Sequence, residues 1–268
     1  YSLSSANSIN WGRLVPQIVY YFSAYADLVK NNEINCGDKI NVVVPTGNFG
    51  NILASYYAYK MGLPVNKFIC ASNENNVLTD FINTGVYNKN RPFHTTSSPS
   101  MDILISSNLE RFLYDLTGEN DKIVSEWMSA LSKDGEYKVS DDVFEKLTSL
   151  MWAGFANDSE TKDAIKKTYD EYKYVIDTHT AVGKSVYDKY VAQTGDNTKT
   201  IIASTASPFK FNQNVLIALD GHNSVVGKNE FELLEALSEK SGLKIPSSLA
   251  ELKTKPVIFD NVCEKNHM

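Results

Sequence analysis

The chain has 268 residues, 43% of them hydrophobic, so it is long enough to bury the core of one large domain or two smaller ones. Its 26 Lys and Arg against 32 Asp and Glu give a net charge of −6, which argues against a nucleic-acid partner. No run approaches the roughly 20 apolar residues that a bilayer-spanning helix needs, so no membrane partner is expected.

The three cysteines form no C-x-x-C pair, and the four histidines show no paired spacing. Neither a disulfide framework nor a metal site is therefore predicted, and a cytoplasmic location suits the thiols. Cys70 lies inside an apolar run and is interpreted as a small buried hydrophobic residue rather than a nucleophile.

The first 75 residues alternate between helical and strand patterns. Apolar residues recur every three or four positions from Ser8 to Val29, which predicts an amphipathic helix with a kink or a first turn near Pro16. The run Ile40 to Val44 is typical of a strand buried on both faces, a helix is expected from Asn51 to Met61, and Lys67 to Ser72 is the next expected strand. This order predicts an α/β fold with a parallel sheet and helices on both faces.

Residues Met101 to Lys173 show only helical periods, which is more than one crossover needs. We therefore expect an inserted helical subdomain at 101–173 between two parts of one α/β domain, at 1–100 and 174–268. Alternation returns with a strand from Thr200 to Ser204, which should lie in the same parallel sheet as the two earlier strands. Further helices are expected at Ala181 to Gln193, Asn212 to Leu219 and Asn229 to Ser241.

The stretch Pro45-Thr46-Gly47-Asn48-Phe49-Gly50-Asn51 joins a buried strand to a helix start through two glycines. Glycines let backbone N–H groups turn inward, and the helix end offers unpaired donors and a positive dipole, so a phosphate group is the expected guest. The loop has neither the Gly-Lys-Ser/Thr ending of a P-loop nor G-x-G-x-x-G spacing. From the residues alone, phosphate binding and an ordinary strand-to-helix turn both remain open.

Residues 44–54, Val-Pro-Thr-Gly-Asn-Phe-Gly-Asn-Ile-Leu-Ala, resemble the cofactor-phosphate loop of threonine synthases. Five further motifs match that family in order: Asn-Ser-Ile-Asn-Trp-Gly-Arg at 7–13, Ser-Pro-Ser-Met-Asp-Ile at 98–103, Ser-Asn-Leu-Glu-Arg at 107–111, Asp-Thr-His-Thr-Ala-Val-Gly at 177–183, and Ser-Thr-Ala-Ser-Pro-Phe-Lys-Phe at 204–211. Together they cover nearly the whole chain. They point to the carboxy-terminal part of the longer, insertion-containing form of the enzyme.

The resemblance implies a tryptophan-synthase-β-like fold, that of fold type II pyridoxal 5'-phosphate enzymes. It also implies the family's reaction, which converts O-phospho-L-homoserine and water into L-threonine and phosphate. The substrate would then be a small molecule. The amino-terminal part of the same enzyme would be the other half of the active site.

The same resemblance assigns roles to particular residues. The cofactor phosphate would be held by residues of the glycine loop, namely Gly47, Asn48, Phe49, Gly50 and Asn51. Thr205 would face the pyridine nitrogen, and its neutral hydroxyl would suit elimination and replacement chemistry. A strand-end threonine that satisfies local backbone groups is the other interpretation of Thr205.

Four residues near the start of the chain are candidate substrate contacts, since a phosphorylated amino acid needs cationic and hydrogen-bonding partners. They are Asn7, Ser8, Asn10 and Arg13. In the simpler alternative, Asn7 and Ser8 cap the helix and Arg13 is an exposed charge on it. His179 has a comparable choice, and we interpret it as a satisfied interior histidine rather than a substrate contact.

The chain departs from the family pattern at Ser207, where His is common, and at Phe209, where Ala is common. The Schiff-base lysine of the family lies in an earlier segment, so no catalytic residue is assigned within this chain. Lys184 and Lys210 are the nearest lysines by motif and are interpreted as solvated or phosphate-pairing charges. The chain alone is therefore expected to be inactive.

Two other functions remain open at this stage. One is a related dehydratase or β-replacement enzyme of the same fold, against which the Asn-Ser-Ile-Asn-Trp motif argues. The other is a noncatalytic fragment that keeps an anion-binding loop without chemistry.

Overall fold

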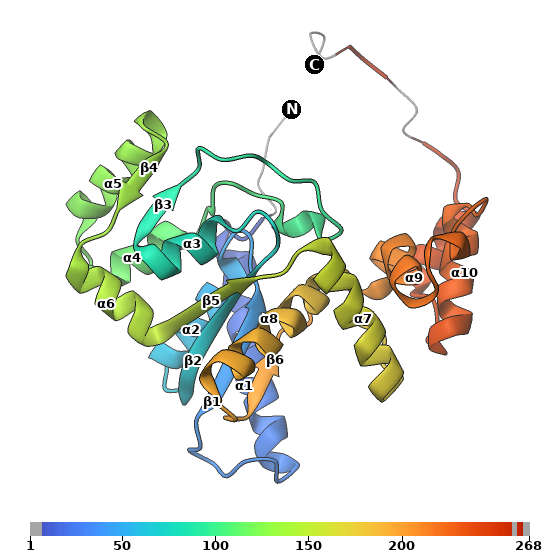
Figure 1. The fold of residues 1–268 in the computed structure, drawn as a ribbon, viewed down its shortest axis with the longest axis horizontal. Coiled ribbons are helices and arrows are strands. Elements are labelled where there is room, and N and C mark those ends of the chain that lie inside the picture. The colour runs from blue at the N-terminus through green and yellow to red at the C-terminus, as the bar shows by residue number, and fades with distance from the viewer. Residues whose placement is uncertain (1–6, 259–261, 265–268) are drawn as a thin grey trace.

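The computed structural model describes residues 7–258 and 262–264, which form an α/β structure around a central sheet (Figure 1). The strands are β1 (Ile40–Pro45), β2 (Val65–Ser72), β3 (Val86–Asn88), β4 (Glu136–Lys138), β5 (Met151–Phe155) and β6 (Thr200–Ile202). The α-helices are α1 (Trp11–Lys30), α2 (Gly50–Lys60), α3 (Val77–Thr84), α4 (Leu109–Leu116), α5 (Asp121–Lys133), α6 (Asp141–Leu150), α7 (Asp158–Tyr172), α8 (Thr178–Thr194), α9 (Asn212–Asp220), α10 (Glu230–Ser241) and α11 (Ser247–Ala250).

The main sheet has the strand order β5-β2-β1-β6, and every pair in it is parallel. The three strands expected from the sequence are therefore parallel neighbours, as predicted. All six residues of β1 are buried, which agrees with its continuous apolar run. β6 ends at Ile202, two residues earlier than expected, so Ser204 lies beyond the strand.

The expectation that 101–173 is purely helical is wrong. Helices α4 to α7 occupy most of this segment, but β5 lies inside it and pairs with β2 as an edge strand of the main sheet. Its sequence, Met-Trp-Ala-Gly-Phe, has no β-branched residue, so the strand forms because β2 offers a free edge rather than through local preference. The small hairpin of β3 and β4 also involves this segment. A domain division at residues 101 and 173 would therefore cut through the sheet.

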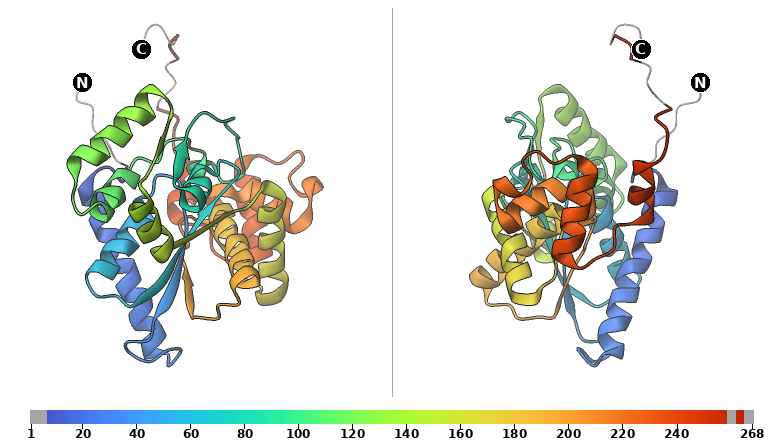
Figure 2. Two further views of the ribbon diagram at one scale, coloured as in Figure 1. Left: turned by 60° about the vertical axis from the view of Figure 1, so that its left-hand side comes forward. Right: turned by 90° about the vertical axis from the view of Figure 1, so that its right-hand side faces the viewer.

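The core consists of three clusters. The largest lies on one sheet face, where Val42 and Phe68 pack against α2 and helices α4 to α6, with Leu14 of α1 on the outside. A second lies on the opposite face, where Val43 packs against Val186 of α8. Figure 2 shows these helices on the two sides of the strands. The helices thus cover both faces of the sheet, as a parallel sheet requires.

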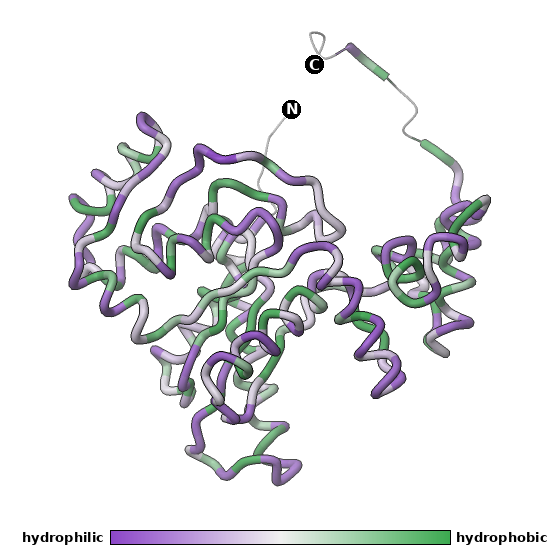
Figure 3. Tube along the Cα trace, in the orientation of Figure 1, coloured by the Kyte–Doolittle hydropathy of each residue, from purple (hydrophilic) through white to green (hydrophobic). Residues whose placement is uncertain are grey.

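The third cluster joins α7 and α8 to the carboxy-terminal helices α9 and α10. These helices form a lobe beside the sheet (Figure 1). Along the trace, the central strands are mostly hydrophobic, whereas the outer helices alternate between hydrophobic and hydrophilic residues (Figure 3). In residues 7–258 and 262–264, no helix combines the length and apolar character needed to cross a membrane.

Helix α1 runs through Pro16 instead of beginning there. Its start is set by Asn10, whose side-chain oxygen accepts a hydrogen bond from the Gly12 amide at 2.9 Å. Proline removes one intrahelical hydrogen bond, the one that would reach the carbonyl of Gly12. Packing of Leu14 and Tyr21 against the core compensates for that loss, because both side chains are almost fully buried.

Asp196 holds the amino-terminal ends of the sheet strands together. Its carboxylate accepts hydrogen bonds from the side chain of Asn41 in β1 at 2.8 Å, the hydroxyl of Tyr190 in α8 at 2.5 Å and the amide of Thr198 at 2.9 Å. Partial burial acts to raise the pKa of Asp196, but these hydrogen bonds outweigh it and hold the pKa well below its usual range. The ionised carboxylate therefore stabilises the junction between β1, α8 and β6.

We expect Asp196→Asn to lower the free energy of unfolding at pH 7 by about 1–3 kcal/mol, because charge-assisted hydrogen bonds become neutral ones. The folded pKa is depressed, so the contribution of Asp196 is complete above the unfolded carboxyl pKa of about 3.9 and declines as the pH falls below it. Urea unfolding at a series of pH values measures the difference. Asp163→Asn, an exposed change on α7, is the control, and a difference that grows on acidification would contradict the assignment.

Candidate functional site

The carboxyl ends of the four parallel strands meet at one edge of the sheet. Ligands of open α/β sheets bind there, at the point where neighbouring strands connect in opposite directions. That point lies between β1 and β6, because β1 leads through α2 to β2 on one side, while the chain returns through α8 to β6 on the other. The residues that follow these two strands, 46–50 and 203–206, therefore flank the expected ligand position.

The loop after β1 presents a row of unpaired backbone donors. Within the part of the chain that the structure describes, none of the amides of residues 47–52 donates a hydrogen bond, and the amide of Leu53 is the first to enter the α2 ladder. The bend is made by Phe49, whose φ is 61°, rather than by a glycine. The Phe49 ring is buried and packs on Phe112 with centroids 5.6 Å apart, which stabilises the left-handed backbone.

The carbonyl groups of the same loop are held from behind. The hydroxyl of Ser106 donates to the carbonyl of Gly47 at 2.8 Å. Asn108 donates to the carbonyl of Asn48 twice, from its amide at 3.1 Å and its side chain at 2.8 Å. Since each peptide group points its carbonyl and N–H in opposite directions, fixing the carbonyls directs the amides toward the open side.

The two glycines of the loop are required by close approach. A Cβ on Gly47 would lie 2.9 Å from the carbonyl oxygen of Ser100 and 3.1 Å from the Cα of Met101, both fixed backbone atoms. A Cβ on Gly50 would lie 2.5 Å from the side chain of Ser8, which can move. The glycines therefore allow packing of the loop instead of supplying a positive φ, which is a correction to the role expected from the sequence.

The unpaired amides face a cavity of about 270 Å³. Its wall includes the whole Gly47 to Asn51 loop, together with Ser8, Arg13, Thr205 and Lys210. Among the described residues that line it there are two cationic side chains and no carboxylate. Although the chain is net negative, this cavity is therefore locally positive and suited to an anion.

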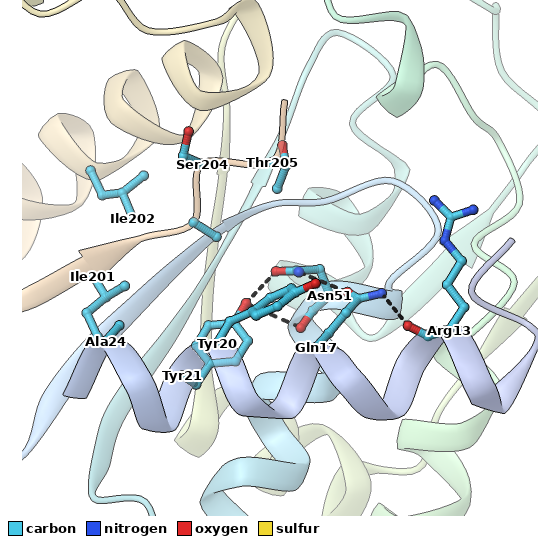
Figure 4. Close-up of a pocket in the computed structure, with 11 residues that line it drawn as sticks. Arg13, Gln17, Tyr20, Tyr21, Ala24, Asn51, Ile201, Ile202, Ser204 and Thr205 are labelled. Atoms are coloured by element: carbon cyan, nitrogen blue, oxygen red, sulfur yellow. Dashed lines mark hydrogen bonds between the residues drawn. The ribbon is translucent and has the colours of Figure 1, made fainter. Parts of the chain in front are cut away.

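A larger groove of about 660 Å³ continues from this cavity between α1 and β6 (Figure 4). Asn51 lies at the junction, where its side chain accepts a hydrogen bond from the hydroxyl of Tyr21 and donates one to Gln17 at 2.9 Å. Burial raises the pKa of Tyr21, so its hydroxyl stays protonated and donates. Thr205 borders both the groove and the cavity. Asn51 thereby fixes α1 against the loop.

His179 lines the cavity from behind and is satisfied by protein groups. Its Nε2 accepts a hydrogen bond from the Ser100 amide at 3.2 Å, and its Nδ1 lies 3.2 Å from a carboxylate oxygen of Asp177. Nδ1 must then carry the proton. Burial acts to raise the pKa of Asp177, but hydrogen bonds from His179 and Thr180 outweigh burial and lower it. The interpretation of His179 as an interior histidine agrees with this geometry, although its ring also contributes to the cavity wall.

The candidate substrate contacts separate into two pairs. Ser8 and Arg13 border the anion cavity. Asn10 caps α1, and the side chain of Asn7 accepts a hydrogen bond from the Ile9 amide at 3.0 Å, so the capping alternative applies to Asn10 and to the turn before it. Of the two lysines, Lys210 borders the cavity.

Other candidate chemical groups lie outside the site. The ammonium of Lys184 is paired with the Asp188 carboxylate at 2.6 Å. Burial raises the pKa of the Cys70 thiol to about 12, which leaves it unreactive. The described residues contain no cluster of three His, Cys, Asp or Glu side chains placed to hold a metal ion.

The roles of Ser106 and Asn108 could not be inferred from the sequence. Both lie about 60 residues after the loop whose carbonyls they hold. The signal was present in the Ser-Asn-Leu-Glu-Arg motif at 107–111, which contains Asn108 and Arg111. The Arg111 guanidinium donates to the side chain of Asn108 at 2.8 Å and orients it.

The parallel α/β sheet with an anion loop at its carboxyl edge places the chain in the fold class of fold type II pyridoxal-phosphate enzymes. A structure of this class, titled as the PLP-bound threonine synthase of Brucella melitensis, superposes with a TM-score of 0.75 at 32% identity. The match covers 90% of this chain and 53% of that one. The expected fold class is thereby confirmed.

Within that class the chain is similar to threonine synthases, and the resemblance to their carboxy-terminal part is confirmed. Residues 180–264 match the family model "Threonine synthase, C-terminal". The threonine synthase of Saccharomyces cerevisiae is 36% identical over 258 residues, covering 91% of this chain and 49% of the relative. Human "Threonine synthase-like 1" is 47% identical over 218 residues, covering 81% of this chain and 29% of the relative. The chain thus spans about half, or less, of these relatives.

Replacing Asn108 by alanine should weaken binding of inorganic phosphate to the loop about 3- to 10-fold, because loss of its side-chain donor frees the Asn48 carbonyl to rotate. Isothermal titration of phosphate into the chain measures the dissociation constant. Asn90→Ala is the matched control, since the Asn90 side chain also donates to a backbone carbonyl, that of Asp134 at 2.9 Å, away from the cavity. Equal phosphate affinity in both variants would argue against the positioning role of Asn108.

Proposed function

We propose that this chain supplies the phosphate-binding side of a pyridoxal 5'-phosphate-dependent threonine synthase. The observation that carries the proposal is the row of six unpaired amides at residues 47–52, which faces a cavity containing Arg13 and Lys210. Backbone donors at a helix start, reinforced by two cations, match the charge and size of a phosphate monoester. In this proposal Gly47, Asn48, Phe49, Gly50 and Asn51 bind the cofactor phosphate.

The cofactor, when bound, supplies the electron withdrawal that makes elimination and replacement at an amino acid possible. The residues of the chain bind and orient it. Thr205, which follows β6 at the mouth of the cavity, would offer its hydroxyl to the pyridine nitrogen. Because a hydroxyl is neutral, it leaves that nitrogen unprotonated, which restrains the electron withdrawal. The α1 wall, fixed by Asn51, would limit access of water from one side.

The proposed reaction converts O-phospho-L-homoserine and water into L-threonine and phosphate. Its support is the similarity to proteins named threonine synthase and the match of motifs along nearly the whole chain. Ser8 and Arg13, which border the anion cavity, are the residues proposed to contact substrate, with Asn7 and Asn10 shaping the turn that positions them. We further propose that the lysine of the reaction comes from the part of such enzymes that this chain does not match.

The three cysteines of the chain are free in the described residues, and a cytoplasmic enzyme is consistent with unpaired thiols. The alternative function is a noncatalytic anion-binding protein. The observation that favours it is the 47% identity to a relative named only as threonine synthase-like, a name that specifies no reaction.

The phosphate assignment can be tested with pyridoxamine 5'-phosphate and pyridoxamine, which lack the aldehyde and so do not react with surface lysines. We expect the phosphorylated compound to bind at least about tenfold more tightly, because each hydrogen bond to a charged group contributes about 1.5–3 kcal/mol. Gly47→Ala should remove most of that difference, since its Cβ would displace the loop from Ser100 and Met101.

The affinities are measured by fluorescence titration of the 268-residue chain. Gly12→Ala is the control, because its Cβ would meet only the side chain of Asn10 and lies outside the cavity wall. Equal affinity for the two pyridoxamine compounds in the unaltered chain would refute phosphate binding by this loop.

The chain by itself should not turn over O-phospho-L-homoserine, even with pyridoxal 5'-phosphate present. Without the other side of the cleft, the substrate is neither oriented nor shielded, and positioning effects worth up to about 7–11 kcal/mol are lost. Release of inorganic phosphate and formation of threonine are measured beside yeast threonine synthase. A threonine rate within about tenfold of the yeast enzyme, which is only about 1.4 kcal/mol of barrier, would mean that a lysine in this chain performs the chemistry.

A further inference from the structure

A separate cavity of about 260 Å³ lies behind the anion loop, between the β3–β4 hairpin and helices α4 and α5. Its wall is mostly apolar, with Leu109, Met128 and Leu131 among its members. It shares no lining residue with the anion cavity, and neither the motifs nor the proposed reaction gives it a role.

One polar group in this wall is buried without a partner. The ring of Tyr137 is stacked between Tyr87, at 5.4 Å between centroids, and Trp127, at 6.0 Å. Its hydroxyl is one of two buried side-chain polar atoms in the described residues that have no hydrogen-bond partner. The neighbouring Tyr87 hydroxyl is satisfied by Ser106 and Leu104. A buried hydroxyl without a partner is destabilising and calls for an explanation.

A carboxylate lies in the same wall. Glu110, on the exposed side of α4, lines the cavity and forms no ion pair within the described residues. Burial, and then the proximity of Tyr87 and Glu110, raises the pKa of Tyr137 well above its usual value. The phenol therefore stays neutral and can accept a hydrogen bond while its charged neighbour supplies the negative field. Among the described lining residues there is no Lys or Arg to offset that charge.

We propose that this cavity binds a small primary ammonium compound, held between the Glu110 carboxylate and the Tyr137 hydroxyl. An ammonium carries three donors and no acceptor, so it satisfies both oxygen atoms at once. The apolar body of the compound would pack against Leu109, Met128 and Leu131. A carboxylate or phosphate ligand would meet the repulsion of Glu110, and an uncharged alcohol would leave that repulsion unused.

The proposal can be tested on the 268-residue chain with n-butylammonium and phenethylammonium as probes. A ligand of this size reaches a dissociation constant of about 1 mM, which ligand-observed NMR titration detects. At equal ionic strength, n-butanol and butyrate are the matched compounds without charge and with the opposite charge. We expect saturable binding of the two ammonium probes and markedly weaker binding of the other two.

Two substitutions locate the binding. Glu110→Gln should weaken n-butylammonium binding about tenfold, and Tyr137→Phe about threefold, because the first removes a charged acceptor and the second a neutral one. Glu126→Gln, an exposed change on α5, is the control. Near-ultraviolet circular dichroism confirms that the variants keep the stacked aromatic rings.

The proposal is overturned if neither ammonium probe shows saturable binding, or if butanol binds as well as n-butylammonium. Unchanged affinity in both folded variants would overturn it as well. These measurements use no cofactor and no phosphate, so their outcome is independent of the function proposed for the anion loop.

Discussion

The orientation of the peptide groups at residues 47–52 is the constraint on which the site depends. Amides that converge on one point require their carbonyls to be satisfied on the other side, because an unpaired buried carbonyl costs about 1–3 kcal/mol. Ser106 and Asn108 meet this requirement from a distant segment of the chain. The loop is thereby prepared for an anion before any ligand arrives, so binding does not have to include the cost of ordering it.

The same segment explains why a residue other than glycine can occupy the left-handed position. Phe49 has a conformation that costs about 1–3 kcal/mol for a side-chain-bearing residue, and its ring is fully enclosed by the cluster that contains Phe112 and Tyr56. Burial of an aromatic side chain recovers about the same free energy. Core packing and anion binding are therefore coupled, and changes in α4 should be felt at the loop.

The sequence was sufficient to predict the parallel strands, the helix starts and the anion loop. Each depends on local information: unbroken β-branched runs for β1, and glycine before a helix for residues 47–51. β5 escaped prediction because its five residues have no local strand preference and pair only once β2 offers a parallel edge. For the same reason a segment with helical periods was mistaken for a separate subdomain.

What the sequence by itself determined is thus the alternation of elements, the motifs shared with threonine synthases and the chemical types available at the strand ends. The tertiary structure alone decided which of those residues meet. It brought Thr205, Arg13 and Lys210 to the loop and used Asn10 as a helix cap. It also enclosed the unpaired hydroxyl of Tyr137 beside Glu110. Contacts between residues 60 or more positions apart depend on how sheet and helices pack, which no local pattern encodes.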